Sequence, residues 1–125
     1  ELEVEELVAE PKIKIASSVE IQEEKQTIVH CHITDYSEDL LIRIWPTTYL
    51  RDVASGHQSK LVTAFNISFH PVWTSVRKNH VFTLVFEGLP KSCNSFDLIE
   101  NIPQSGGFYA PGIRRNKTDV YTINV

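Results

Sequence analysis

The sequence has no methionine and only two cysteines among its 125 residues. Cys31 and Cys93 are too few for the disulfide framework that holds many small secreted domains together. The pattern leaves open whether they are bridged or free, because Cys31 falls within an expected strand and Cys93 within an expected loop. Neither has a neighbouring base that would favour a nucleophile. A chain that begins at Glu1 without methionine is expected to be a processed product or a piece of a longer protein.

Long apolar runs and an excess of positive charge are also missing. No run approaches the ~18 apolar residues that suggest a membrane helix, and no N-terminal signal peptide is visible, so we expect no membrane span. The net charge is −4, from 16 acidic and 12 basic residues, which disfavours a nucleic-acid partner. Much of the acidic excess lies in residues 1–11, which we interpret as an N-terminal segment or linker. The length fits one domain, at 12–125.

Catalytic motifs are absent as well. The chain has no serine-nucleophile elbow, no phosphate loop, no HExxH and no Cys–Xaa–Xaa–Cys. The stretch SGHQS holds Ser55, His57 and Ser59 in an expected turn, but a hydrolytic set also needs an orienting acid and an oxyanion site. We therefore expect a protein that is not an enzyme and uses no cofactor.

What the sequence does contain is apolar–polar alternation with the period of a half-buried strand. Val29, Cys31 and Ile33 share one face of KQTIVHCHITD, and Phe82, Leu84 and Phe86 share one face of FTLVFEG. Other runs with strand character are PKIKIASSVEIQEE, EDLLIRIWP, TTYLRD, SKLVTAFNISFHP, VWTSV, SFDLIE and DVYTINV. Turn residues separate these runs, which is typical of an antiparallel all-β sandwich or barrel.

The stretch after Phe86 predicts how one strand ends and the next begins. Gly88 and Pro90 should end the first strand, because proline cannot donate to a central ladder and glycine weakens one. Phe96 and Leu98 then re-enter the core, and we expect Leu89 to close one end of the sandwich.

Several segments together resemble an immunoglobulin-like module of exported Bacteroidetes proteins. They are TYLRD, SGHQSKLVTAFNISF, FTLVFEGLPKSCNSFDLIE and GGFYAPGI. The similarity runs from about Val19 to Ile113 and consists of hydrophobic spacing and the pairs Leu89-Pro90 and Phe96-Asp97. It implies an antiparallel immunoglobulin-like β-sandwich of about seven to nine strands, serving as an accessory module outside the cytoplasm, in the periplasm or at the cell surface. It implies no activity, because a fold does not determine a function.

Two groups of residues suggest metal chemistry. His30 and His32 emerge on one face of an expected strand, and a third ligand would have to come from His57, His70, His80 or a carboxylate. We interpret the pair as belonging to a solvated sheet face, because a stable zinc site needs three or four ligands. Asp35, Glu38 and Asp39 gather in one loop but lack the spacing and glycine of a calcium loop, so we expect a solvated hairpin turn.

Aromatic and basic residues suggest binding surfaces. The aromatic candidates for a sugar-binding face are Trp45, Tyr49, Trp73, Phe108 and Tyr109. We expect most of them to be structural, with Trp73 the more exposed of the two tryptophans. The cluster RRNK, residues 114–117, is by default a solvated loop, and a local anion contact with a partner protein remains open.

The expected function is therefore that of a non-catalytic interaction module. It would meet another protein or a neighbouring domain through a sheet face, an edge strand or end loops. A homodimer through edge strands is also open. The alternative function is that of a small-ligand binder for a carbohydrate or a metal ion.

Overall fold

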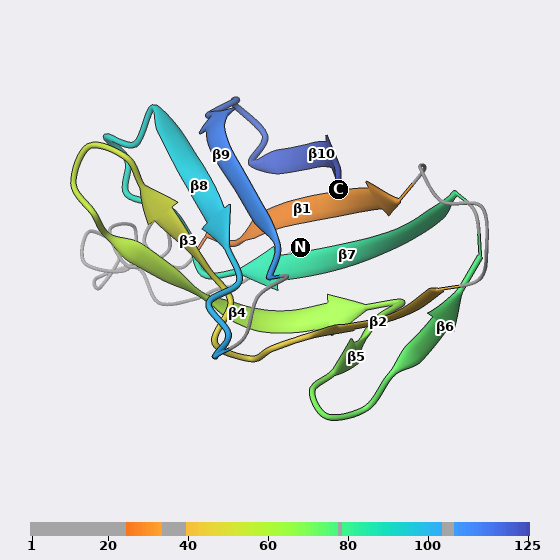
Figure 1. Ribbon diagram of the computed structural model, residues 1–125. Helices are drawn as coiled ribbons and strands as arrows, with labels where there is room; N and C mark the ends of the chain where they lie inside the picture. The colour runs from red at the N-terminus through yellow and green to blue at the C-terminus, as the bar shows by residue number, and fades with distance from the viewer. Residues whose placement is uncertain (1–24, 34–39, 78, 104–106) are drawn as a thin grey trace, which may run out of the picture.

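The computed structural model describes residues 25–33, 40–77, 79–103 and 107–125, and these fold into β-strands joined by turns and loops (Figure 1). Ten strands are described. They are β1 (Thr27–Ile33), β2 (Leu40–Ile44), β3 (Tyr49–Asp52), β4 (Gln58–Phe65), β5 (Ser68–Phe69), β6 (Thr74–Val76), β7 (His80–Phe86), β8 (Ser95–Ile99), β9 (Tyr109–Arg114) and β10 (Val120–Asn124). The all-β class expected from the alternation is confirmed. The described residues include no helix long and apolar enough to cross a membrane.

The strands form one large and one small sheet. The large sheet has the order β10-β1-β7-β4-β3-β8-β9, and the small one has the order β5-β2-β6. Most neighbours are antiparallel, but β1 pairs with β10 and β2 pairs with β5 in parallel. The expectation of purely antiparallel pairing therefore fails at two places. Parallel strands need a long connection, and the chain between β1 and β10 provides one.

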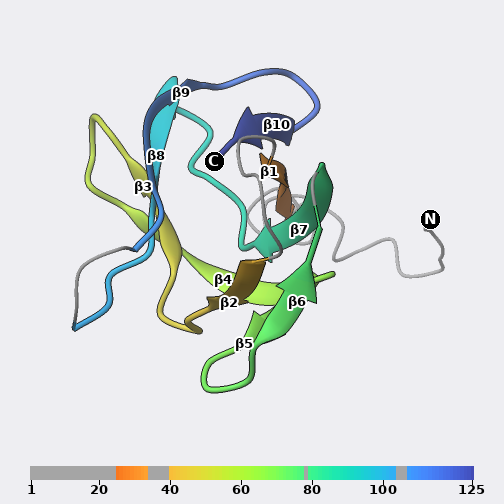
Figure 2. The same ribbon diagram turned by 45° about the vertical axis from the view of Figure 1, so that its right-hand side comes forward.

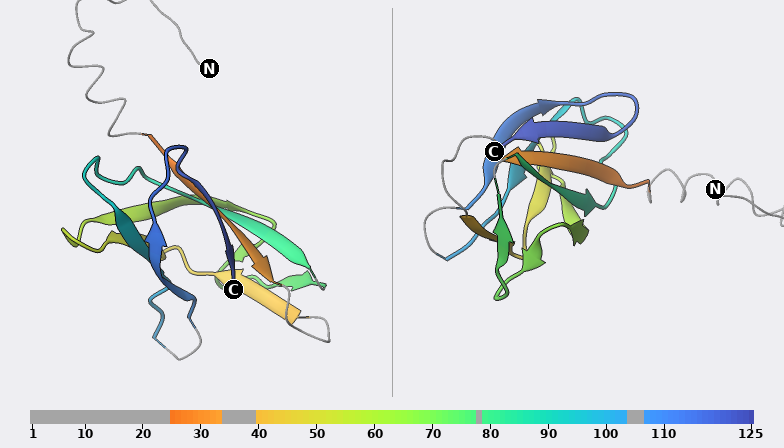
Figure 3. Two further views of the ribbon diagram at one scale, coloured as in Figure 1. Left: turned by 90° about the horizontal axis from the view of Figure 1, so that it is seen from above. Right: turned by 90° about the vertical axis from the view of Figure 1, so that its right-hand side faces the viewer.

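The large sheet curls, so that its two halves face each other (Figures 2 and 3). The ring centroids of Phe82 on β7 and Phe108, the residue before β9, lie 5.7 Å apart. The ring of Phe96 on β8 meets that of Tyr121 on β10 edge-on at 4.9 Å. Aromatic side chains thus fill the space between the halves, where each fully buried one stabilises the fold by roughly 1.5–3 kcal/mol.

Much of the core consists of residues that the alternation placed on inner faces. Phe82, Leu84 and Phe86 are completely buried. In β1 the burial alternates strictly, with Val29, Cys31 and Ile33 inside, as expected. Strand β7 ends at Phe86, before Gly88 and Pro90, the residues predicted to end it. Further buried residues are Leu89, Phe96 and Leu98, also as expected.

Strand β9 was not expected, because Pro111 and Gly112 interrupt its pattern. The register between β8 and β9 shifts next to Asp97, so β9 is bulged. Gly112 has a positive φ of 66°, which glycine adopts without steric cost, and its N–H donates to Asp97 Oδ1 at 2.8 Å. Arg51 Nη2 lies 3.0 Å from the other carboxylate oxygen of Asp97. Asp97 therefore holds the bulge in place and joins β9 to β3.

Three expectations lie outside the described residues. They are the acidic segment 1–11, the strand predicted in PKIKIASSVEIQEE, and the loop with Asp35, Glu38 and Asp39.

Candidate functional site

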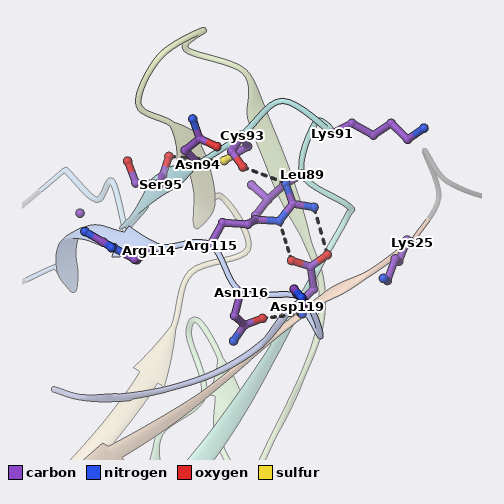
Figure 4. Close-up of a pocket in the computed structure, with 12 residues that line it drawn as sticks. Lys25, Leu89, Lys91, Cys93, Asn94, Ser95, Arg114, Arg115, Asn116 and Asp119 are labelled. Atoms are coloured by element: carbon purple, nitrogen blue, oxygen red, sulfur yellow. Dashed lines mark hydrogen bonds and ion pairs between the residues drawn. The ribbon is translucent and has the colours of Figure 1, made fainter.

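A hollow of the described surface lies at the end of the molecule where β7 leads into β8 and β9 leads into β10. Its volume is about 960 Å³. The lining residues come from the segment before β1, from the β7–β8 loop with the start of β8, and from the end of β9 with the β9–β10 loop (Figure 4). Five of them are basic, and they are Lys25, Lys91, Arg114, Arg115 and Lys117. Asp119 is the single acid among the described residues of the lining, in a chain whose net charge is −4. We refer to this site as the basic hollow.

Arg115 ties the two loops of the basic hollow together. Its Nε and Nη2 donate to Asp119 Oδ1 and Oδ2 at 2.7 and 3.1 Å, a two-pronged ion pair. Its Nη1 donates to the carbonyl oxygens of Pro90 at 2.7 Å and Cys93 at 3.2 Å. The backbone adds a hydrogen bond from Arg115 N to Asn94 O at 2.8 Å. The N–H groups of the guanidinium are thus mostly hydrogen-bonded within the protein, so Arg115 shapes the hollow.

The β9–β10 loop is also bonded to itself. Asn116 Oδ1 accepts hydrogen bonds from the backbone N–H groups of Thr118 at 3.0 Å and Asp119 at 2.7 Å. Tyr121 accepts from the N–H of Asn116 at 3.0 Å and donates its hydroxyl proton to Asp119 Oδ1 at 2.9 Å. Asparagine favours such turns because its side chain can bond to the backbone two residues on. The loop therefore has a defined shape, anchored through the buried side chain of Tyr121.

Asp119 is the electrostatic centre of this network, with only 4% of its side chain exposed. Burial raises the pKa of its carboxyl. Hydrogen bonds from Arg115 and Tyr121, with the positive charges of Arg115 and Lys25, outweigh burial and bring the pKa below its ordinary value. For Tyr121, burial and the bond to Asp119 raise the pKa of the phenol. Asp119 is therefore held as a carboxylate and neutralises Arg115.

Among the described residues, no acid neutralises Lys91, Arg114 or Lys117 in this way. Within the described part of the chain, the ion pairs are Arg51–Asp97 and Arg115–Asp119. Lys91, Arg114 and Lys117 are exposed and pair with none of the described acids. The hollow thus presents positive charge to solvent, and what it can do chemically is attract anions.

Both thiols are free and buried, which answers the question that the sequence left open. Burial raises the pKa of Cys31 to about 12. Burial and a hydrogen bond with Asp52 raise that of Cys93 to about 11. Such thiols stay protonated at neutral pH, and the thiolate is the reactive form. Cys93 therefore contributes to the wall of the hollow without being a nucleophile there.

The candidate metal ligands do not come together. His30 and His32 share one face of β1, but His30 Nδ1 is 2.8 Å from Thr83 Oγ1. His70 stacks on Trp45 with 3.7 Å between ring centroids, and His80 Nε2 lies 2.7 Å from the carbonyl oxygen of Asn66. His57 lies exposed between β3 and β4. In the residues that the structure describes, no three His, Cys, Asp or Glu side chains are grouped to hold a metal ion.

The serine residues near His57 stabilise the β3–β4 hairpin and its contact with the β7–β8 loop. Ser55 Oγ donates to the buried carboxylate of Asp52 at 2.6 Å and accepts from the N–H of His57 at 3.1 Å. Ser59 Oγ donates to Gly88 O at 2.9 Å. These hydroxyls therefore have structural partners.

The aromatic candidates are divided between core and surface. Trp73 is 50% exposed and Tyr109 62% exposed, whereas Phe108 packs on Phe82 and Trp45 stacks on His70. The guanidinium of Arg43 lies 3.9 Å from the centre of the Trp73 ring and so covers one of its faces. Trp73 and Tyr109 are therefore the exposed candidates, whereas Phe108 and Trp45 have ring partners within the protein.

Sequence reasoning singled out residues 114–117 of the basic hollow but missed Lys25 and Lys91. These two lie far from RRNK in the sequence, and only the β1–β10 pairing and the β7–β8 loop bring them near it. Comparison of the chain with protein-family models, curated proteins and solved structures gave no match.

Proposed function

We propose that this chain is a non-catalytic interaction module whose immunoglobulin-like β-sandwich presents the basic hollow to an acidic partner, either another protein or a neighbouring domain. The curled sheet with two facing halves supports the scaffold part of the proposal. The observation that carries the binding part is the gathering of five basic side chains at one end of a chain with net negative charge. The proposal includes an extracytoplasmic location, which rests on the sequence resemblance alone.

Loops held by a rigid scaffold are the common setting for recognition. Here the β7–β8 and β9–β10 loops are linked through Arg115, so the positive charges around them keep a stable arrangement. A hollow of this kind attracts its partner through charge, which favours fast association and makes binding sensitive to salt.

Retention on a carboxylate-bearing chromatography matrix at pH 7 and low salt tests this function. A chain with net charge −4 is repelled on average, so retention requires a local basic surface. We expect the native chain to be retained and Lys117→Glu to elute earlier. Arg77→Glu changes the net charge by the same amount. Arg77 lies before β7, about 20 Å from the end of that strand that leads to the basic hollow, so this variant should elute later than Lys117→Glu. Equal elution of the two variants would contradict the proposal.

A further inference from the structure

Most main-chain N–H groups of the β9–β10 loop already donate to acceptors within the protein. The N–H groups of Arg115, Asn116, Thr118 and Asp119 donate to Asn94 O, the Tyr121 hydroxyl and Asn116 Oδ1. Compact phosphate sites usually combine free backbone N–H groups with converging cations. In this loop four of the five N–H groups of residues 115–119 have protein acceptors, so the loop is not a phosphate cradle.

The free cations do not converge on a point. Figure 4 shows Arg114 on one side of Arg115 and Lys91 and Lys25 on the other, with Lys91 extending outward. Arg115 in the middle is neutralised by Asp119. The positive charge available to a ligand therefore lies on both sides of Arg115 and is not gathered at one point.

We propose that the ligand of the basic hollow is an extended acidic polypeptide segment with several spaced carboxylates. This inference rests on the proposed function and specifies its partner. A chain of carboxylates can meet Lys91, Arg114 and Lys117 in succession, which a compact anion cannot. None of the described residues that line the hollow is aromatic, so among them the bases of a single-stranded nucleic acid would find no stacking surface.

The chain itself supplies a suitable probe. Residues 1–10, ELEVEELVAE, contain five glutamates and no basic residue. A fluorescently labelled peptide of this sequence is titrated with the full chain and followed by anisotropy. The control peptide QLQVQQLVAQ has the same length and apolar pattern without the carboxylates.

We expect the acidic peptide to bind at least tenfold more tightly than the glutamine peptide at low salt. Lys91→Glu, Arg114→Glu and Lys117→Glu should each weaken binding by roughly two- to fivefold, because exposed ion pairs are individually weak. Arg77→Glu serves as the matched charge-reversal control and should weaken binding less than any of the three. A full chain with its first five glutamates changed to glutamine should bind the peptide at least as tightly as the native chain.

Competition experiments give the results that would overturn the inference. At constant ionic strength, inorganic phosphate should not displace the peptide, and neither should a single-stranded oligonucleotide of equal charge. Displacement by phosphate, or loss of binding through one variant alone, would indicate a compact anion site instead. Displacement by the oligonucleotide would indicate a nucleic-acid surface. If the carboxylate matrix retains the chain through the hollow but the two peptides bind equally, this inference fails while the proposed function stands.

Discussion

At the scale of single residues, Asp119 stabilises the loops that form the basic hollow. It is buried and bonds to both Arg115 and Tyr121, and its pKa in the folded protein lies below its ordinary value. A carboxyl with a lowered pKa contributes stability above its unfolded pKa of about 3.9. This contribution is lost as the pH falls through the folded pKa.

We therefore expect Asp119→Asn to lower the free energy of unfolding at pH 7 by about 1.5–3 kcal/mol, the range for hydrogen bonds to charged groups. The difference from the native chain should shrink as the pH falls below about 4. Urea unfolding at several pH values measures this. Lys117→Gln, in the same loop but exposed, should change stability little. A difference for Asp119→Asn that stayed constant down to pH 2 would argue against this account.

At the scale of elements, the bulge in β9 depends on one glycine. Gly112 has a φ of 66°, and a Cβ added there would meet no atom within 4 Å. Gly112→Ala should therefore cost only the backbone strain of a left-handed conformation, about 1–2 kcal/mol. Gly112→Asn should cost less, because asparagine tolerates this region better. Thermal unfolding of the two variants checks the order, and equal losses would show that the backbone conformation is not the cause.

Gly107 provides a contrasting position before the same strand. A Cβ there would clash with the backbone carbonyl of Glu100. The side-chain carboxylate of Glu100 also accepts a hydrogen bond from the N–H of Phe108 at 3.0 Å. Gly107→Ala should therefore displace the chain leading into β9. The two glycine variants thus separate backbone strain from steric exclusion.

The sequence predicted the elements better than their pairing. Buried and less buried residues alternate in β1, and in β7 Phe82, Leu84 and Phe86 point inside. Both patterns were predictable because a strand with one buried face has a period of two. Strand β9 was missed because Pro111 and Gly112 resemble turn residues, and only Asp97 on β8 explains why they lie in a strand. The parallel pairing of β1 with β10 depends on long-range packing, which no local pattern encodes, and for the same reason Lys25 and Lys91 escaped notice as site residues.

At the scale of the whole molecule, stability rests on the contact between the two halves of the curled sheet. Phe82 is fully buried and packs against Phe108 from the other half. Phe82→Ala should therefore cost about 3–5 kcal/mol, a large part of the 5–15 kcal/mol typical of a domain. Phe65→Ala on β4, where the side chain is 55% exposed, should cost much less. Chemical unfolding of both variants tests this, and similar losses would mean that the interior does not lie between the halves.

The β1–β10 pair has a consequence for how the molecule would carry tension. The two strands run in parallel through five register pairs, from Ile28 opposite Val120 to His32 opposite Asn124. A pull applied before β1 and after β10 acts at opposite ends of this pair, so it slides one strand along the other. All of the hydrogen bonds between them would then bear the load together instead of opening one by one, and the flanking segments could transmit force without first peeling the sheet apart.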